Sequence, residues 1–164
     1  MKRARIYVIS GQFAWLGSSL GMLRLAQRIR ASFPGSLTTT HGWKSPDEIA
    51  MDIMARGRDV PKIIIGYSLG ANDVPFIASR MQRTEIALGV CYDPSQYGIM
   101  VKPTPQNIKR LLLYHNTGTV GFGHALFEGP NVERTDVDTN HLAICYNESL
   151  HQKTMYAVWK VHNE

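Results

Sequence analysis

The stretch of this chain best suited to chemistry is the pentapeptide Gly66-Tyr67-Ser68-Leu69-Gly70, which has the pattern G-x-S-x-G. An apolar run precedes it and a helix-like segment follows it. In that context the pattern predicts a serine on a strained strand-to-helix turn, with its Oγ exposed at the carboxyl edge of a sheet. The N–H of Leu69 would open the helix and point at a developing oxyanion. The other interpretation is a tight turn whose serine only caps a helix.

A serine hydroxyl is a weak nucleophile, so it requires a base within hydrogen-bond reach and an acid that orients that base. Asp93 directly follows the apolar run Ile86–Tyr92, and His141 follows the run Val132–Val137 and precedes the last helical segment. Both residues are expected at the carboxyl ends of strands, where ligands bind in open parallel sheets. The chain order serine, aspartate, histidine is the order that accompanies this elbow motif.

Other residues compete for these two roles. Asp136 and Asp138 lie closer to His141 in the sequence than Asp93 does, and His115 ends another strand and is the main rival base. Because a proline follows it, Asp93 has a second interpretation as a turn initiator. His141 has a second interpretation as a loop residue that caps the last helix. The sequence leaves these alternatives open.

A second oxyanion N–H is expected from the loop after the first strand, where Gln12 and Phe13 follow Gly11. A plain strand-to-helix turn accounts for the same residues equally well. Three further side chains are candidates for the walls of a substrate site, namely Trp15, Trp43 and His124. Packing of the two tryptophans against the sheet is an equally good interpretation of those two residues.

Short apolar runs alternate with helical periodicity along the chain, which predicts a parallel α/β sheet. Strands are expected at about 5–9, 37–41, 62–67, 86–92, 110–115 and 132–137, and helices at about 16–33, 45–57, 71–82 and 147–161. The segments 93–109 and 116–130 are rich in proline or glycine and are expected to be loops. The expected buried face of the first helix is Leu16, Leu20, Leu23, Ala26, Ile29 and Phe33.

These elements predict a three-layer α/β fold in which a mostly parallel sheet of about six strands is flanked by helices. The length of 164 residues is ordinary for one domain with a substantial core, so residues 1–164 are expected to form a single domain. The net charge of +5 is scattered and not interleaved with aromatic residues, so no nucleic-acid partner is expected. The sequence leaves the oligomeric state open.

The apolar runs are too short for a transmembrane helix or a signal peptide, which predicts no integral membrane association and a cytoplasmic location. The segment Gly11–Gly17 fits neither the dinucleotide pattern nor the P-loop pattern, so no nucleotide cofactor is expected. The two cysteines form no C-x-x-C pair, and the histidines fall in separate segments. Neither a metal site nor a disulfide framework is therefore expected.

Four short motifs make the chain similar to the α/β-hydrolase superfamily, specifically to its lipase and esterase-like branch. Residues 66–71 resemble the G-[HY]-S-L-G-[AG] elbow of lipases. Tyr92-Asp93-Pro94 is similar to the L-D-P step that carries the aspartate, and Asn140-His141-Leu142 resembles the N-H-L around the histidine. The segment Pro105–Arg110 is similar to the P-x-N-V-x-R lead-in to the next strand. The resemblance spans about residues 5–160.

The resemblance implies that Ser68 is the nucleophile, His141 the base and Asp93 the acid, with Leu69 and either Gln12 or Phe13 forming the oxyanion hole. It implies a serine hydrolase that cleaves small-molecule carboxylic esters through an acyl-enzyme, without a cofactor. A thioesterase or acyltransferase, and a catalytically silent binding module, are the alternatives. The chain departs from the family by replacing the usual His-Gly of the oxyanion loop, by lacking two leading antiparallel strands, and by having no stretch for a helical lid. A minimal hydrolase core with an open site is therefore expected.

Overall fold

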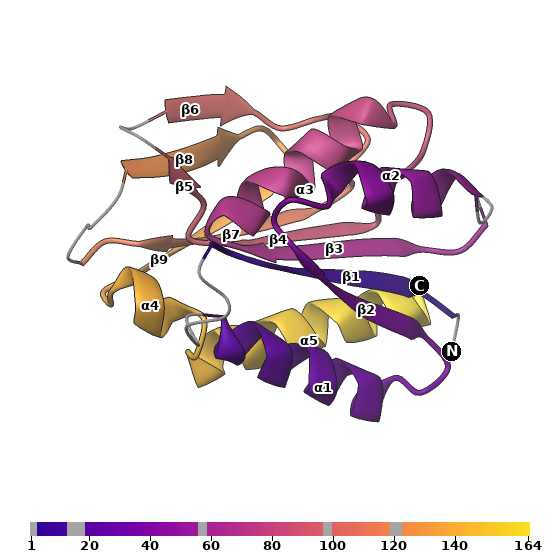
Figure 1. The fold of residues 1–164 in the computed structure, drawn as a ribbon, viewed down its shortest axis with the longest axis horizontal. Helices are drawn as coiled ribbons and strands as arrows, with labels where there is room; N and C mark the ends of the chain where they lie inside the picture. The colour runs from indigo at the N-terminus through magenta and orange to yellow at the C-terminus, as the bar shows by residue number, and fades with distance from the viewer. Residues whose placement is uncertain (1–2, 13–18, 56–58, 97–99, 119–122) are drawn as a thin grey trace.

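The computed structural model describes residues 3–12, 19–55, 59–96, 100–118 and 123–164 (Figure 1). Within these residues the main sheet has six strands in the order β2-β1-β3-β4-β7-β9, and every neighbouring pair is parallel. The strands are β1 (Arg5–Ser10), β2 (Leu37–Gly42), β3 (Lys62–Tyr67), β4 (Leu88–Tyr92), β7 (Leu111–Asn116) and β9 (Val132–Val137). The predicted fold class is confirmed, although the division into domains stays a prediction.

Four helices cover the two faces of this sheet. Helices α1 (Leu20–Ser32) and α5 (Glu148–Asn163) lie on one face, and α2 (Pro46–Ala55) and α3 (Leu69–Arg80) lie on the other (Figure 1). Each face has its own apolar cluster with the helices that cover it. Strand β3 is buried along its whole length because helices cover both of its faces, which explains its continuous apolar run. No helix in the described part of the chain is long and apolar enough to span a membrane.

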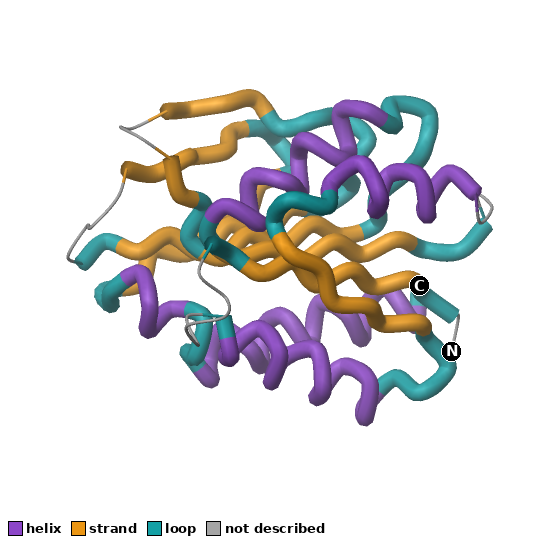
Figure 2. Tube along the Cα trace, in the orientation of Figure 1, coloured by secondary structure: helices purple, strands orange, loops and turns teal. Residues whose placement is uncertain are grey.

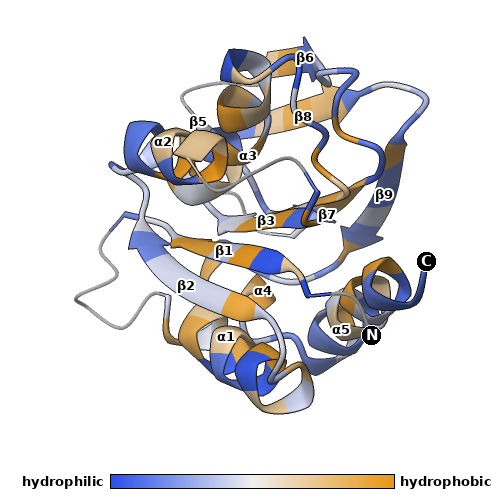
Figure 3. Ribbon diagram, turned by 90° about the vertical axis from the view of Figure 1, so that its right-hand side faces the viewer, coloured by the Kyte–Doolittle hydropathy of each residue, from blue (hydrophilic) through white to orange (hydrophobic). Residues whose placement is uncertain are grey.

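Hydropathy follows the position of each strand in the sheet. Figure 3 shows β1 largely apolar, whereas the edge strand β9 is mostly hydrophilic. The four central residues of β9, Glu133–Asp136, are all polar, and every residue of this edge strand is half-buried or exposed.

Helix α1 buries only part of the face expected for it, with Ala26 and Ile29 of the helix and the following Phe33 buried as predicted. Its buried residues are Gly21, Met22, Leu25, Ala26 and Ile29, while Leu20 and Leu23 are 47% and 42% exposed. Gly21 is also on the buried face, and an added Cβ there would collide with the carbonyl group of Cys145. A glycine contributes nothing to the hydrophobic pattern, so this close approach of α1 to the segment before α5 could not be predicted from the sequence. Leu16 lies outside the described residues.

A second sheet of three strands lies where loops were expected. Strands β5 (Ser95–Gln96), β8 (Gly123–Glu128) and β6 (Met100–Pro103) pair in the order β5-β8-β6, beside α3 (Figure 2). The loop prediction for these segments is wrong because it rested on their proline and glycine content. The alternating side chains Ala125 and Phe127 are buried in the core cluster that α2 and α3 also form. The packing of this small sheet on α3 therefore stabilises strands that are weak by composition.

The order of the strands determines where a site opens. Strand β1 lies between β2 and β3, so successive crossovers leave β1 in opposite directions. A crevice forms at the carboxyl end of strands at such a switch point. Gly11 follows β1 and Ser68 follows β3 at this place. The topology therefore places the predicted serine turn beside the loop expected to supply an oxyanion donor.

Candidate active site

Ser68 lies on a strained turn between β3 and α3, with φ 58° and ψ −123°. A non-glycine residue at positive φ is uncommon and costs about 1–3 kcal/mol, which the surrounding structure must offset. The Ser68 N–H donates to the carbonyl of Tyr92 at 2.9 Å, and the Ser68 carbonyl accepts from the Ala71 N–H at 3.0 Å. The predicted elbow geometry is therefore present, with the turn fixed on one side by β4 and on the other by α3.

Three glycines allow the backbone to close around this turn. A Cβ on Gly66 would collide with the carbonyl group of Gly70, and a Cβ on Gly70 would lie 2.6 Å from the carbonyl oxygen of Ser10. A Cβ on Gly11 would lie 2.7 Å from the Cβ of Ser68. The loop after β1 therefore passes directly against the serine side chain, and only glycine fits at these positions.

The structure brings together the three side chains that the sequence singled out. His141 Nε2 lies 2.9 Å from Ser68 Oγ, and His141 Nδ1 lies 2.7 Å from Asp93 Oδ2. Ser68 follows β3, Asp93 follows β4, and His141 opens the short helix α4 (His141–Ile144). Ser68 and Asp93 are buried. This is the geometry in which a histidine can take the hydroxyl proton while a carboxylate holds its ring.

Two groups outside the predicted set hold His141. Asn140 caps α4 by accepting from the Ala143 N–H at 2.8 Å. The Tyr67 hydroxyl donates to the His141 carbonyl at 2.9 Å, and the two rings stack with centroids 5.1 Å apart. Tyr67 belongs to the predicted pentapeptide, but its role depends on where α4 lies. The sequence gives no signal for that placement.

Asp93 is held through its backbone and through both carboxylate oxygens. Its φ is 44°, and its N–H donates to the carbonyl of Tyr114 at 2.8 Å. While Oδ2 binds His141, Oδ1 accepts from the Asn116 N–H at 3.2 Å and lies 3.2 Å from His124 Nδ1. A buried carboxylate requires such partners because burial otherwise disfavours its charge. These contacts to Asn116 and His124 were not predicted from the sequence.

The rival base and one rival acid contact each other. His115 Nδ1 lies 3.2 Å from Asp136 Oδ1 and 3.0 Å from an Arg134 guanidinium nitrogen. Arg134 Nε also donates to Asp136 Oδ1 at 2.6 Å. Burial lowers the pKa of His115, and the positive charge of Arg134 lowers it further. The carboxylate that binds the His141 ring at 2.7 Å is that of Asp93.

The expected oxyanion donors are only partly described. Leu69 is the first residue of α3, so its N–H belongs to the first helical turn, where intrahelical acceptors are lacking. Gln12 directly follows Gly11, which packs against Ser68. Phe13 lies outside the described residues. The role of these three residues stays a prediction.

The candidate wall residues have different positions. Trp43 lines a groove of about 680 Å³, whose walls also include residues of α3 and of the β6–β8 sheet. Trp15 lies outside the described residues. His124 lies in β8, is 8% exposed and lies against the Asp93 carboxylate. Its expected place in the wall of a substrate site stays a prediction.

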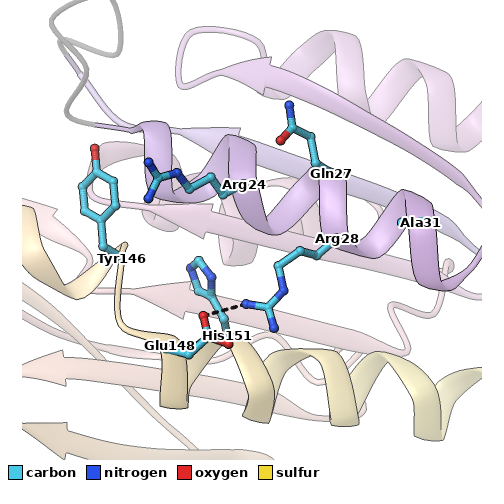
Figure 4. Close-up of a pocket in the computed structure, with 7 residues that line it drawn as sticks. All are labelled: Arg24, Gln27, Arg28, Ala31, Tyr146, Glu148 and His151. Atoms are coloured by element: carbon cyan, nitrogen blue, oxygen red, sulfur yellow. Dashed lines mark hydrogen bonds and ion pairs between the residues drawn. The ribbon is translucent and has the colours of Figure 1, made fainter.

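A second hollow, of about 460 Å³, lies between α1 and the start of α5 (Figure 4). Its arginines already have partners. Arg28 forms an ion pair with Glu148 at 2.7 Å, and the guanidinium of Arg24 lies 5.7 Å from the centre of the Tyr146 ring. None of the residues that line this hollow belongs to the Ser68 cluster.

Metal ligation finds no support in the described residues, where no group of three or more histidine, cysteine or acidic side chains is placed to hold an ion.

Comparison with known proteins supports the same fold. No protein-family model and no curated protein matches the sequence. The NocB thioesterase domain, solved as a covalent complex with a fluorophosphonate nocardicin G analog, matches with a TM-score of 0.58 and 12% identity over 98% of this chain and 95% of that one. YbtT, a type II thioesterase from the yersiniabactin NRPS/PKS biosynthetic pathway, matches with a TM-score of 0.56 and 10% identity over 98% and 95% of the two chains.

Identities this low establish the fold alone. The chain thus has the α/β-hydrolase fold of these thioesterase domains, which confirms the fold implied by the sequence motifs.

Proposed function

We propose that this chain is a serine hydrolase that cleaves carboxylic esters or thioesters through an acyl-enzyme. The observation that carries the proposal is the continuous contact from Ser68 Oγ to His141 Nε2 at 2.9 Å and from His141 Nδ1 to Asp93 Oδ2 at 2.7 Å. It is strengthened by the positive φ of Ser68, because strained backbone persists mainly at functional sites.

In the proposed reaction, Ser68 Oγ attacks the acyl carbonyl carbon while His141 Nε2 takes its proton. Asp93 keeps the proton of the neutral ring on Nδ1 and stabilises the imidazolium that forms. The Leu69 N–H, with that of Gln12 or Phe13, binds the oxyanion. His141 then gives its proton to the leaving alkoxide or thiolate, and it activates the water that releases the acid from Ser68.

Fluorophosphonate labelling tests whether Ser68 is activated. The folded protein is expected to incorporate one probe, which peptide mass spectrometry should locate on Ser68, because the hydroxyl has a base at hydrogen-bond distance. The Ser68→Ala variant is the matched control and should not be labelled. Absence of labelling in protein shown to be folded would contradict the proposal and favour a silent binding module.

The thioesterase alternative gains weight from the comparison, because both structural neighbours described above are thioesterases. The acyl-enzyme step is common to the two substrate classes, so the leaving group must be tested directly. A matched ester and thioester with the same acyl group, competing in one assay, separate the classes by their ratio of kcat/KM. Product formation with an added alcohol or amine acceptor would instead indicate an acyltransferase.

The groove beside α3 is where we place the acyl group. Asn72 lines it and donates to the Ser95 carbonyl at 2.6 Å, while the Ser95 hydroxyl lies 3.4 Å from Ser68 Oγ. One wall residue of the groove, Asn72, is therefore connected to the proposed nucleophile through Ser95. Trp43, Phe76 and Phe127 are among the residues that line the groove farther along, so its walls suit an apolar chain.

The polar residues of the groove are Lys44, Asn72, Asp73, Ser79 and Lys102, and the other seven lining residues are prolines or aromatic residues. Lys44 and Lys102 are exposed, and Asp73 is half-buried. Burial raises the pKa of Asp73 to about 7, so a large part of this carboxyl is uncharged near neutral pH. A lining that is apolar and only partly charged favours an acyl chain over a polyanionic ligand.

Truncating Phe76 should change the dependence of activity on chain length. In the wild type, kcat/KM for p-nitrophenyl esters should rise by up to about fourfold per added methylene while the chain fills the groove. Phe76→Ala removes a 43% exposed wall residue and should flatten that rise for chains that reach it. Leu23→Ala on α1, which is 42% exposed on the other face of the sheet, is the control. Equal slopes in all three proteins would place the acyl chain elsewhere.

A further inference from the structure

The Asp93 carboxylate lies between two imidazole rings, of which only His141 has a role in the proposed reaction. His141 Nδ1 lies 2.7 Å from Oδ2, and His124 Nδ1 lies 3.2 Å from Oδ1. The Asn116 N–H donates to the same Oδ1 at 3.2 Å. Asp93 is fully buried and His124 is 8% exposed, so water has little access to these contacts.

The backbone around His124 is fixed to the turn that carries Asp93. His124 pairs with Ser95 in the antiparallel β5–β8 ladder, and the next residue, Ala125, donates its N–H to the Pro94 carbonyl at 2.9 Å. The residues on both sides of this contact therefore belong to one hydrogen-bonded unit. The His124 ring thus approaches Asp93 from a strand, which defines its position better than a free loop would.

The groups behind His124 limit where its ring can move. The His115 ring of β7 lies edge-on to it, with centroids 4.6 Å apart, and Arg134 and Asp136 of β9 contact His115 in turn. Burial and the charge of Arg134 lower the pKa of His115, which favours the neutral ring against His124. Asp93 on one side and His115 on the other therefore enclose the His124 imidazole.

We propose that His124 is a positioning residue, which holds Oδ1 of Asp93 so that Oδ2 faces His141; this role rests on the proposed hydrolase function. A carboxylate can rotate about its Cβ–Cγ bond, and Asp93 stands on a backbone turn with φ 44°. A polar N–H group beside Oδ1 stabilises the ionised carboxylate and resists that rotation. His124 itself touches no reacting atom in this scheme.

Two substitutions separate the polar contact from the packing of the ring. Asparagine carries an amide nitrogen near the position of the histidine Nδ1, whereas leucine keeps comparable volume without a polar atom. His124→Leu should lower kcat about tenfold with KM changed less than twofold, and His124→Asn should retain kcat within about threefold. Arg24→Ala in the hollow between α1 and α5 serves as a control that should match the wild type.

The pH profile supplies a readout that a purely structural role would not move. Without His124 the Asp93 anion is less stabilised, so the Asp93–His141 pair takes up a proton more readily. The apparent pKa of the acid limb of kcat/KM should therefore rise in His124→Leu and stay near the wild-type value in His124→Asn. Activity of His124→Leu should accordingly be lost at a higher pH than activity of the wild type.

Several results would overturn the inference. These are an unchanged kcat in folded His124→Leu, equal damage by the leucine and asparagine variants, and a rise in KM alone, which would indicate a substrate contact. Fluorophosphonate labelling of the wild type keeps the two proposals distinguishable, because its failure counts against the hydrolase function itself. NMR spectra of the His141 ring then still test His124, because the ring resonances should change in His124→Leu and stay close to those of the wild type in His124→Asn.

Discussion

Replacing Ser68 with alanine is expected to lower kcat for an ester substrate at least about 10⁴-fold, with little change in the fold. The substitution removes only Oγ, which lies 2.9 Å from His141 Nε2, whereas the Ser95 hydroxyl lies farther from that nitrogen, at 3.4 Å. Within the described residues, the Ser68 side chain makes no cap hydrogen bond to α3, so its loss leaves the helix start intact. Stopped assays over hours with purified variant and wild type would measure the difference.

A second variant, Ser68→Gly, also lacks the hydroxyl but relieves the backbone strain at this position, so it serves as a control for stability. Alanine must keep φ near 58°, whereas glycine adopts positive φ without steric cost. Ser68→Gly should therefore be inactive yet exceed Ser68→Ala in free energy of unfolding by about 1 kcal/mol, as urea denaturation would measure. Ester hydrolysis by either variant at the wild-type rate would contradict the assignment of the nucleophile.

The positions of Ser68, Asp93 and His141 could be predicted because each follows the end of a strand or opens a helix. In a parallel sheet all strand ends of one kind meet at one edge, so topology alone brings such residues together. The same reasoning correctly predicted β3, whose continuous apolar run reflects burial on both faces. It needed no knowledge of side-chain contacts, but it left Asp136 and His115 as rivals, and the choice of Asp93 and His141 came from the resemblance to the α/β-hydrolase superfamily.

The parts that could not be predicted depend on contacts between distant segments. Strand β8 is flanked by glycines and pairs with β5, a strand of only two residues, so neither has a clear period. His124 was therefore expected in a loop rather than beside Asp93. The inward face of α1 was predicted only in part for a similar reason, because the close approach of Gly21 to Cys145 gives no hydrophobic signal in the sequence.

The two described non-glycine residues with positive φ are the proposed nucleophile and the proposed acid. Each of the two residues makes a backbone hydrogen bond to the next strand: the Ser68 N–H donates to the Tyr92 carbonyl, and the Asp93 N–H donates to the Tyr114 carbonyl. Each turn is thus tied to the end of the next strand in the sheet. Positive φ is unfavourable for serine and aspartate, so both turns lower the stability of the fold. We infer that they are retained for the geometry of the site and not for stability.

Replacing Asp93 with asparagine is expected to lower kcat about 10⁴-fold at neutral pH while KM changes little. The Asn116 N–H at 3.2 Å from Oδ1 requires an acceptor there, so the amide of the variant should turn its NH₂ group toward His141. That NH₂ group would donate to Nδ1 and move the ring proton to Nε2, the atom that must accept from Ser68. The imidazole would then occupy its place in the wrong tautomer and could not act as a base.

Asp136→Asn is the matched control, because Asp136 was the rival acid and its carboxylate contacts His115 and Arg134. Its kcat should remain within about threefold of the wild type, since no described contact joins it to the Ser68 hydroxyl. For both variants, the initial rate of turnover is compared with the rate at which Ser68 is labelled. A folded Asp93→Asn should react slowly with the fluorophosphonate, in proportion to its loss of turnover, which separates a tautomer effect from misfolding. The reverse pattern, with an active Asp93→Asn and an inactive Asp136→Asn, would transfer the acid role to the β9 carboxylate and require His115 as the base.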